Sequence, residues 1–318
     1  MSVAGALFVI VLPVFLLVGL GAASVRLKIF PDAGVDALIS FATQIAVPVL
    51  LFRAIYRLDL GTAIDPRHLI SFYGAAAVSF AAGILFARLV WRRRPGEAVA
   101  IGFSALFSNS VLLGLPIAER AFGAAAMPAV FAIVAFHAPF CYLLGILTME
   151  LSRRDGAPIR AALGRTVKAM FRNALTVGIA VGFAFNLAAV PIPEPVAAVI
   201  DMLAEAALPV ALFALGGVLT RYRMRAEIGE AAMVATLSLG LHPLLAWTLA
   251  AHVFALEPPF VQAAVIIAAM PPGVNGYVFA AMYDRAVGTA ASTVILATGL
   301  SVVTVTVWLW VMGVSGFD

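Results

Sequence analysis

The chain has 318 residues, of which 64% are hydrophobic and only 11% are charged. Globular chains carry about 25% charged residues, so this composition excludes an ordinary soluble protein. A membrane-spanning helix needs about 20 mostly apolar residues, and the apolar residues are numerous enough for about ten such helices. Little sequence remains for an extramembrane domain, so we expect one transmembrane domain over residues 1–318. Cys141 is the single cysteine, which excludes a disulfide framework.

Charged residues, Pro and Gly divide the chain into ten apolar runs. The runs cover residues 5–25, 34–56, 69–91, 98–118, 125–149, 170–190, 196–219, 229–254, 260–282 and 289–312. Met1 to Gly5 carry no Lys or Arg, so we expect the first run to be a spanning helix and not a cleaved signal peptide. The sequence therefore predicts an all-α membrane protein with ten transmembrane helices.

Lys and Arg are distributed unequally between alternate loops. The loops after spans 1, 3, 5, 7 and 9 contain 16 of the 20 residues, and the other side has only Arg53, Arg57, Arg67 and Arg120. Because cytoplasmic loops retain positive charge, we expect a multi-pass protein of the inner membrane with both termini outside. The Arg-rich tracts then act as topology anchors beside the lipid bilayer, and no nucleic-acid partner is expected.

Two short patterns recur along the chain. Residues 47–52 (VPVLLF) in span 2 recur as 208–213 (LPVALF) in span 7, and residues 119–126 after span 4 recur as 284–291 after span 9. The offsets of 161 and 165 residues are nearly equal, which indicates two copies of a five-span unit, about 5–149 and about 170–312. Because five is odd, the second copy enters the membrane from the opposite side. Such inverted repeats are typical of secondary transporters with a substrate site near the midplane.

Spans 4 and 9 contain helix-breaking residues at equivalent places in the two repeats: residues 107–116 read FSNSVLLGLP, and residues 270–277 read MPPGVNGY. Pro removes a backbone donor and Gly tolerates non-helical torsions, so each span is predicted to open into two half-helices, although simple kinks are the alternative. Half-helix N-termini favour an anion such as a carboxylate. We expect Asn109 and Asn275 to donate to that carboxylate and to cap the freed backbone groups. The predicted substrate-binding residues are Asn109, Ser110, Gly114, Pro116, Pro271, Gly273, Asn275 and Tyr277.

Other polar residues lie inside the apolar runs. Glu205 in span 7, whose repeat mate is Gln44, is a candidate for proton coupling because a charge at that depth is costly. His137 in span 5 is a candidate for substrate binding or coupling, with a packed, hydrogen-bonded histidine as the alternative. His242 in span 8 is a weaker candidate of the same kind. The Ser and Thr residues of span 10 are interpreted as helix-packing residues.

Enzyme chemistry has little support in the sequence. The chain lacks a His-Glu-x-x-His zinc motif, a Walker loop and paired intramembrane aspartates, so no metal and no cofactor are predicted. A membrane-embedded enzyme is the alternative from another class. A cation/proton antiporter is the alternative among transporters, and it should require an acidic residue at the broken spans, which this chain does not have.

Several of these motifs together resemble the auxin efflux carrier family. They are residues 24–32 (SVRLKIFPD), 46–48 (AVP), 109–116 (NSVLLGLP) and 270–280 (MPPGVNGYVFA). The resemblance covers essentially the whole chain. That family includes the plant PIN carriers and bacterial permeases assigned to malonate, malate and similar acids.

The resemblance implies an inverted-repeat fold in which spans 1, 2, 6 and 7 form a scaffold and spans 3–5 and 8–10 form a moving domain with crossed helices 4 and 9. It implies an elevator-like movement of a bound organic anion, a homodimer through the scaffold, and a substrate role for Asn109. Leu51 stands where the plant carriers have a serine, and Asn275-Gly276 stands where they have Val-Pro. We therefore expect a permease for a small mono- or dicarboxylate and not for auxin.

Overall fold

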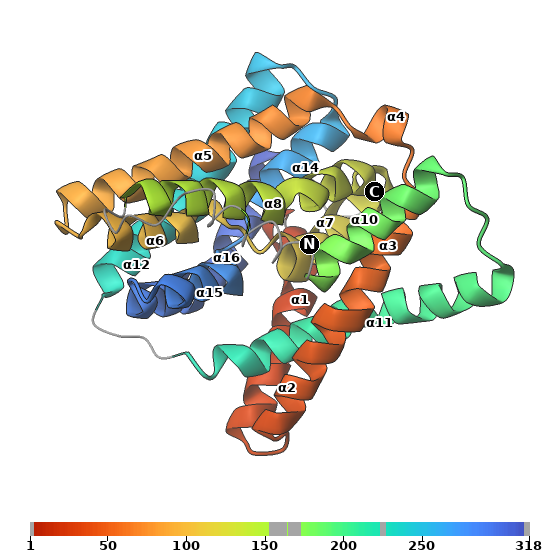
Figure 1. Ribbon diagram of the computed structural model, residues 1–318, viewed down its shortest axis with the longest axis horizontal. Coiled ribbons are helices and arrows are strands. Elements are labelled where there is room, and N and C mark those ends of the chain that lie inside the picture. The colour runs from red at the N-terminus through yellow and green to blue at the C-terminus, as the bar shows by residue number, and fades with distance from the viewer. Residues whose placement is uncertain (1–2, 153–163, 165–172, 223–226, 315–318) are drawn as a thin grey trace. The chain divides into compact units, whose positions relative to one another are not determined.

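The computed structural model describes residues 3–152, 164, 173–222 and 227–314, and within them the repetitive structure is helical (Figure 1). Seven of the described helical segments are long and apolar enough to cross a membrane. They are Phe8–Arg26, Asp32–Tyr56, Pro66–Leu89, Met127–Ser152, Glu194–Leu219, Ile228–Val253 and Val287–Val311. Shorter apolar helices cover Ala174–Leu187 and Pro258–Ala268. The protein is therefore an all-helical membrane protein, and the count of ten spans and their inverted relation stay predictions.

The chain divides into two compact units. Unit 1 consists of Met1–Leu12, Ile64–Thr166 and Tyr222–Asp318, and unit 2 consists of Pro13–Ala63 and Val167–Arg221. Helix α1 (Val3–Arg26) contributes to both units. The Lys and Arg residues expected between spans 5 and 6, together with Arg223 and Arg225, lie outside the described residues.

The helices of each unit follow the apolar runs of the sequence. Those of unit 2 are α2 (Asp32–Phe41), the π-helical turn η1 (Ala42–Ala46), α3 (Val47–Tyr56), α4 (Leu60–Ala63), α10 (Ala174–Leu187) and α11 (Glu194–Leu219). Those of unit 1 are α5 (Pro66–Leu89), α6 (Pro95–Leu106), η2 (Ser110–Gly114), α7 (Leu115–Phe122), η3 (Gly123–Ala125), α8 (Met127–Ser152), α12 (Ile228–Thr236), η4 (Leu237–Leu241), α13 (His242–Trp247), η5 (Thr248–Val253), α14 (Pro258–Ala268), α15 (Val274–Tyr283) and α16 (Val287–Val311).

The ends of these helices have local chemical causes. Helix α5 begins with proline at its first position, where a missing N–H costs nothing, and the Asp65 carboxylate accepts a hydrogen bond from the Arg67 N–H at 2.8 Å. Asn173 caps α10 in the same way by accepting from the Leu175 N–H at 2.9 Å. Helix α7 ends at Phe122 because the next residue, Gly123, has a φ of 62°, in a region that glycine adopts without strain.

In unit 2, helices α1 and α11 cross at two glycines. A Cβ atom on Gly216 would overlap the carbonyl oxygen of Val18, and one on Gly21 would overlap the carbonyl oxygen of Phe213. Small residues that let two backbones approach closely are the usual contact between membrane helices. The crossing of α1 and α11 therefore depends on the absence of side chains at both positions.

The variant Gly216→Ala is expected to destabilise the protein by about 1–3 kcal/mol, because the added methyl group must push α1 away from α11. Thermal unfolding in detergent micelles would measure this. Gly19→Ala on α1, the other helix of the crossing, is the matched control, because a Cβ there meets nothing within 4 Å, and its unfolding temperature should equal or exceed that of the wild type. An unchanged unfolding temperature for Gly216→Ala would contradict the close crossing.

In unit 1, aromatic packing holds α6, α8 and α15 together. The Phe103 ring of α6 stacks on the Phe279 ring of α15 with centroids 3.8 Å apart. Gly145 of α8 faces both rings, since a Cβ there would overlap Phe103 and lie 3.2 Å from Phe279. Figure 1 shows α5 beside α6 and α15 beside α16, and the two helices within each pair pack against each other. This packing fixes the two helices that end or begin at the interruptions of spans 4 and 9.

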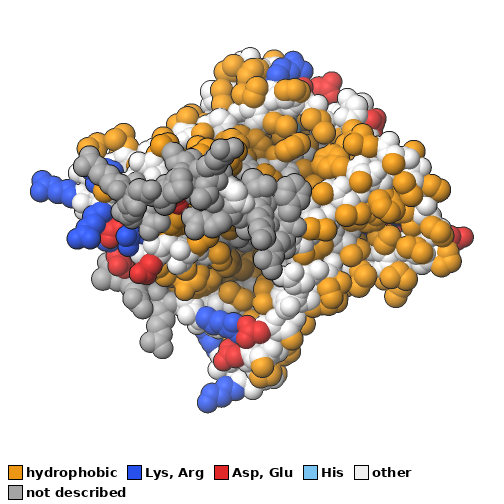
Figure 2. Space-filling model, viewed as in Figure 1, with side chains coloured by type: hydrophobic (Ala, Val, Ile, Leu, Met, Phe, Trp, Pro, Cys, Tyr) orange, Lys and Arg blue, Asp and Glu red, His pale blue; other side chains and the backbone are white. Residues whose placement is uncertain are grey.

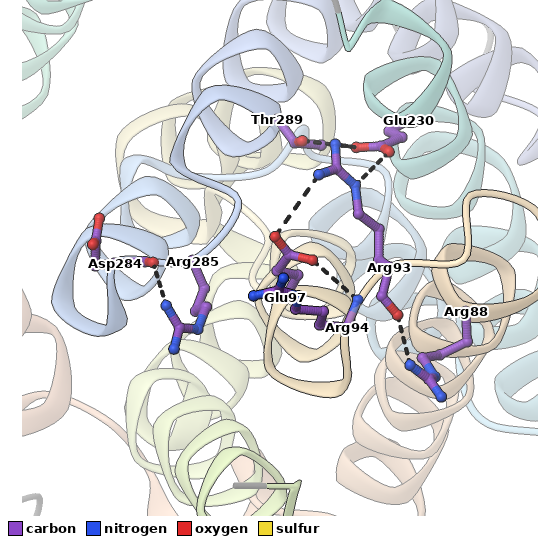
Figure 3. Close-up of polar contacts among 8 residues, drawn as sticks. All are labelled: Arg88, Arg93, Arg94, Glu97, Glu230, Asp284, Arg285 and Thr289. Carbon is purple, nitrogen blue, oxygen red and sulfur yellow. Dashed lines mark hydrogen bonds and ion pairs between the residues drawn. The ribbon is translucent and has the colours of Figure 1, made fainter.

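A buried ion pair joins the segment between α5 and α6 to α12 and α16 in unit 1 (Figure 3). The Arg93 guanidinium donates to both oxygens of Glu230, at 2.8 and 3.0 Å, and the Thr289 hydroxyl donates to the same carboxylate at 2.8 Å. Glu230 is only 3% exposed. Its carboxylate raises the pKa of the Arg93 guanidinium above the usual value, since it hydrogen-bonds the charged form.

Apolar side chains cover much of the visible surface in Figure 2, whereas Lys and Arg gather at a few places along its edges. The last turns of α5 illustrate this pattern, since Leu85, Phe86, Leu89 and Val90 are all exposed and Arg92 follows them. Exposed apolar side chains of this extent are expected where a helix faces hydrocarbon.

Candidate functional site

The first interruption lies between α6 and α7. Helix α6 ends at Leu106, residues 107–109 leave the helical path, and the chain resumes as the π-helical turn η2. Asn109 has φ −75° and ψ 61°, which is not helical. Pro116, in the first turn of α7, has no N–H to donate to the carbonyl of residue 112, so the regular α-helical hydrogen bonding is interrupted where the π-helical turn η2 lies.

The second interruption lies between α14 and α15. Helix α14 ends at Ala268, and α15 begins at Val274. Pro271 and Pro272 both lack an N–H and fall between these helices. Both interruptions occur where the sequence predicts them, and both belong to unit 1.

The two interruptions pair with each other through their backbones. The Asn109 N–H donates to the Pro271 carbonyl at 2.8 Å, and the Gly273 N–H donates to the Phe107 carbonyl at 3.0 Å. Ser108 and Pro272 lie opposite each other as an isolated antiparallel bridge. Non-helical backbone at membrane depth is tolerated only where protein or water satisfies its polar groups. Here backbone groups of each break provide hydrogen-bond partners for backbone groups of the other.

The expectation that Asn109 and Asn275 cap the freed backbone groups is wrong. Neither asparagine forms a side-chain cap, because the backbone pairing across the two breaks already uses several of the freed groups. The Asn109 side chain makes no hydrogen bond within the described part of the chain. The Asn275 Oδ1 atom accepts a hydrogen bond from the Tyr142 hydroxyl at 3.2 Å. Asn109 therefore keeps its full donor capacity, and Asn275 keeps its amide N–H groups.

Two helix N-termini converge beside Asn109. The η2 turn starts at Ser110, directly after Asn109, and α15 starts directly after Gly273. A Cβ atom on Gly273 would lie only 3.5 Å from the Asn109 Cα, so the two chain segments are in close contact there. First-turn N–H groups generally have no acceptor within their own helix and carry partial positive charge. Here the Ser110 N–H donates to the Ser108 carbonyl at 2.8 Å and the Gly276 N–H to the Gly273 carbonyl at 3.0 Å, so the donors left for a ligand are the other first-turn N–H groups. Together with the Asn109 amide, which is 8% exposed, they form a set of donors suited to an anion.

The remaining predicted substrate residues surround the pairing in different ways. Ser110 and Gly114 are buried in η2, and the Gly114 N–H donates to the Asn109 carbonyl at 3.0 Å. Pro116 is buried in the first turn of α7. Tyr277 lies in α15, with its ring centroid 4.9 Å from that of Tyr222. These residues shape the breaks or flank them, whereas Asn109 and Gly273 lie at the contact itself.

Helix α8 contacts both interruptions, and His137, which the sequence suggested as a candidate for substrate binding or coupling, makes one of these contacts. The His137 Nε2 atom lies 3.1 Å from the Ser108 carbonyl oxygen and 3.4 Å from the Ser108 Oγ. Tyr142, which contacts Asn275, is a site residue that sequence reasoning missed. His137 and Cys141 are four residues apart and share one helix face, whereas Tyr142 is turned by about 100° from Cys141, so helical spacing did not mark it. Ser108 was also missed.

Glu205 and Gln44 are not part of this arrangement. Both side chains are exposed, and both residues belong to unit 2, whereas the paired breaks belong to unit 1. In the described residues no ion pair involves residues 107–110 or 271–276. Nor could any group of three or more His, Cys, Asp or Glu side chains in the described residues hold a metal ion. The fixed charges of the site are thus helix dipoles.

Comparison with known proteins assigns the chain to a protein family. The model of the membrane transport protein family matches residues 6–309. The chain belongs to this family. This membership agrees with the resemblance to auxin efflux carriers in the sequence motifs. Two relatives match the chain over nearly its whole length. A protein of Rhizobium meliloti (strain 1021) named "Putative malonate transporter" is 29% identical over 95% of each chain. A Methanothermobacter thermautotrophicus protein named "Uncharacterized transporter" is 27% identical over 94% of this chain and 96% of its own.

As a member of the membrane transport protein family with seven described helical segments fit to span a bilayer, the protein is a multi-pass membrane transporter. Family and relatives alike point to transport and not to an enzyme. The paired breaks of unit 1 are the part of this transporter whose chemistry suits a bound ligand.

Proposed function

We propose that the protein is a permease for small organic anions of the mono- or dicarboxylate class. The observation that carries this proposal is the convergence of the η2 and α15 N-termini beside an Asn109 amide with no hydrogen-bond partner in the described chain. Fixed donors without a counter-charge favour a carboxylate over a cation. The name of the Rhizobium meliloti relative adds support for a dicarboxylate such as malonate.

The carboxylate would bind between the two breaks. Asn109 and the first-turn N–H groups of η2 and α15 other than those of Ser110 and Gly276 would donate to its oxygens, and the amide N–H groups of Asn275 would contact the second end of a dicarboxylate. Backbone donors bind any carboxylate, so the length of the anion would be selected by the residues that flank the breaks.

Transport would occur by an elevator-type alternating access. Both breaks belong to unit 1, and the division of the chain into two compact units supports a moving part and a scaffold. In this proposal unit 1 corresponds to spans 3–5 and 8–10, and unit 2 corresponds to spans 1, 2, 6 and 7. The proposal includes ten spans in two inverted repeats, a homodimer through the scaffold, and an inner-membrane location with both termini outside.

Counterflow in proteoliposomes tests the function. Vesicles with the full-length protein and a trapped unlabelled carboxylate are expected to take up the same labelled acid faster than protein-free vesicles, with malonate, malate, lactate and indole acetate tested separately. We expect exchange of malonate or another short acid to exceed that of indole acetate. Labelled choline, a cation of similar size, is the control and should not exchange. Cation-driven pH changes without exchange of any carboxylate would instead identify an antiporter.

A further inference from the structure

Two buried histidines lie close to the first break or to the aromatic side chain beside it, and the carboxylate function proposed above does not use them. His137 on α8 is 2% exposed, and His242 at the start of α13 is fully buried. Both rings pack on Phe72 of α5, with centroid distances of 5.6 and 5.0 Å. The two imidazoles therefore lie on one aromatic side chain inside unit 1.

The hydrogen bonds of His137 assign its two ring nitrogens. Nε2 lies 3.1 Å from the Ser108 carbonyl oxygen, which can only accept, so Nε2 carries a proton and donates it. Nδ1 lies 3.8 Å from the Cys141 Sγ. The same sulfur lies 3.9 Å from the Leu106 carbonyl oxygen. The thiol can therefore donate to Nδ1 when the ring is neutral and to Leu106 when Nδ1 is protonated.

The groups around His137 provide no permanent counter-charge. Phe72 and Tyr73 face the ring from α5, and Phe107 faces it from the first break. Tyr73 donates its hydroxyl to the Ile133 carbonyl at 2.6 Å and is a neutral neighbour. In the described residues no carboxylate or guanidinium contacts the ring. The titratable groups near it are Tyr73, Cys141, Tyr142 and His242.

Protonation of His137 and His242 at the same time is unfavourable. Its Nε2 lies 3.4 Å from the Phe72 carbonyl oxygen, and its Nδ1 is a buried polar atom with no hydrogen-bond partner. A charged imidazole in apolar surroundings is costly, and two charged rings that share Phe72 would also repel each other. The empty site therefore favours two neutral rings.

A carboxylate at Asn109 changes this balance, because Asn109 follows Ser108, whose backbone and hydroxyl contact His137. The anion supplies the counter-charge that an imidazolium lacks. By linkage, an anion that favours the protonated ring binds more tightly when the ring is protonated. On the basis of the proposed function, we infer that the protein binds one proton at His137 together with each carboxylate and moves the two together.

In this cotransport step no covalent bond forms between the protein and the anion. A proton from the aqueous phase on the entry side adds to the neutral Nδ1 of His137 as the anion binds. After unit 1 opens to the other side, the anion leaves and the proton returns to water there. One negative charge of the cargo is thereby compensated, so a monocarboxylate would move without net charge.

A pH gradient across proteoliposomes tests this inference. With the membrane potential clamped at zero, an acidic exterior should drive wild-type malonate accumulation of about tenfold per pH unit, since one proton is worth about tenfold per unit. A pH dye inside the vesicles should report acidification that requires malonate. Protein-free vesicles correct for passive diffusion of the neutral acid. The variant His137→Gln, which keeps a donor for Ser108, should bind malonate more weakly, still exchange saturating malonate at equal pH, and lose accumulation and acidification.

His252→Gln is the matched control, since His252 is exposed in η5, and it should behave as the wild type. Wild-type counterflow without malonate-dependent acidification would overturn proton coupling and leave the carboxylate function intact, whereas absent counterflow would overturn both. If His137→Gln does not fold, the wild-type dye measurement alone decides the inference. A folded His137→Gln that still accumulates malonate about tenfold per pH unit would exclude His137 as the proton site.

Discussion

Replacing Asn109 with alanine is expected to reduce carboxylate counterflow at least tenfold at substrate concentrations below half-saturation. A hydrogen bond to a charged group contributes about 1.5–3 kcal/mol, which corresponds to a factor of about 10–150 in affinity. The amide of Asn109 makes no hydrogen bond to the described protein, so its removal should leave the fold unchanged. Initial uptake rates, normalised to the amount of folded protein in the vesicles, measure the effect.

Gln262→Ala is the matched control, because Gln262 carries the same amide group on α14 but lies before the second break. Its transport rate should equal that of the wild type. Asn275→Ala should reduce transport less than Asn109→Ala, since the Asn275 Oδ1 is already bound by Tyr142. Wild-type rates in both asparagine variants would indicate that the breaks serve helix geometry and not anion binding.

Replacing Glu230 with alanine is expected to destabilise the folded protein by about 3 kcal/mol. Removal of one partner from a buried ion pair costs about 3–5 kcal/mol, because the other charge is left uncompensated. The lower figure applies because the Arg93 side chain is 27% exposed and can regain some water. Thr289 also loses its acceptor. A lowered unfolding temperature in detergent, and a smaller monodisperse peak in size-exclusion chromatography, are the expected readouts.

Glu97→Gln is the control for this prediction. Glu97 also lies near Arg93, but its carboxylate is 3.9 Å away and its side chain is 26% exposed. A partly exposed pair at this longer distance contributes about 0–1 kcal/mol, so Glu97→Gln should unfold within a degree or two of the wild type. Equal losses in the two variants would show that the depth of burial of Glu230 does not determine its contribution.

The positions of the breaks could be predicted because their cause is local. Pro116 and the Pro271–Pro272 pair lack backbone donors, and this property is visible in the sequence. The pairing of the breaks was beyond such reasoning, because hydrogen bonds between residues 107–109 and residues 271–273 depend on the tertiary fold. The same limit explains why Asn109 was expected to cap backbone groups that the other break already satisfies.

The long-range polar contacts could not be predicted from the sequence either. Arg93 and Glu230 are separated by 137 residues, and nothing in their local sequence distinguishes them from other Arg and Glu residues near helix ends. Glu205 was predicted as a coupling residue because its apolar neighbours suggested a position deep in the membrane, yet its side chain is exposed in unit 2. Position along an apolar run does not reveal which face of a helix is covered.

The bridge between Ser108 and Pro272 has a consequence for the direction of net flux. Because the two breaks are joined by backbone hydrogen bonds, they form one piece that would keep its shape wherever unit 1 lies. The anion would then meet the same donors from either aqueous compartment, and its affinity would be similar on both sides. Import and export would be equally available to such a carrier, and the gradients of the anion and of the coupled proton would together set the direction of net flux.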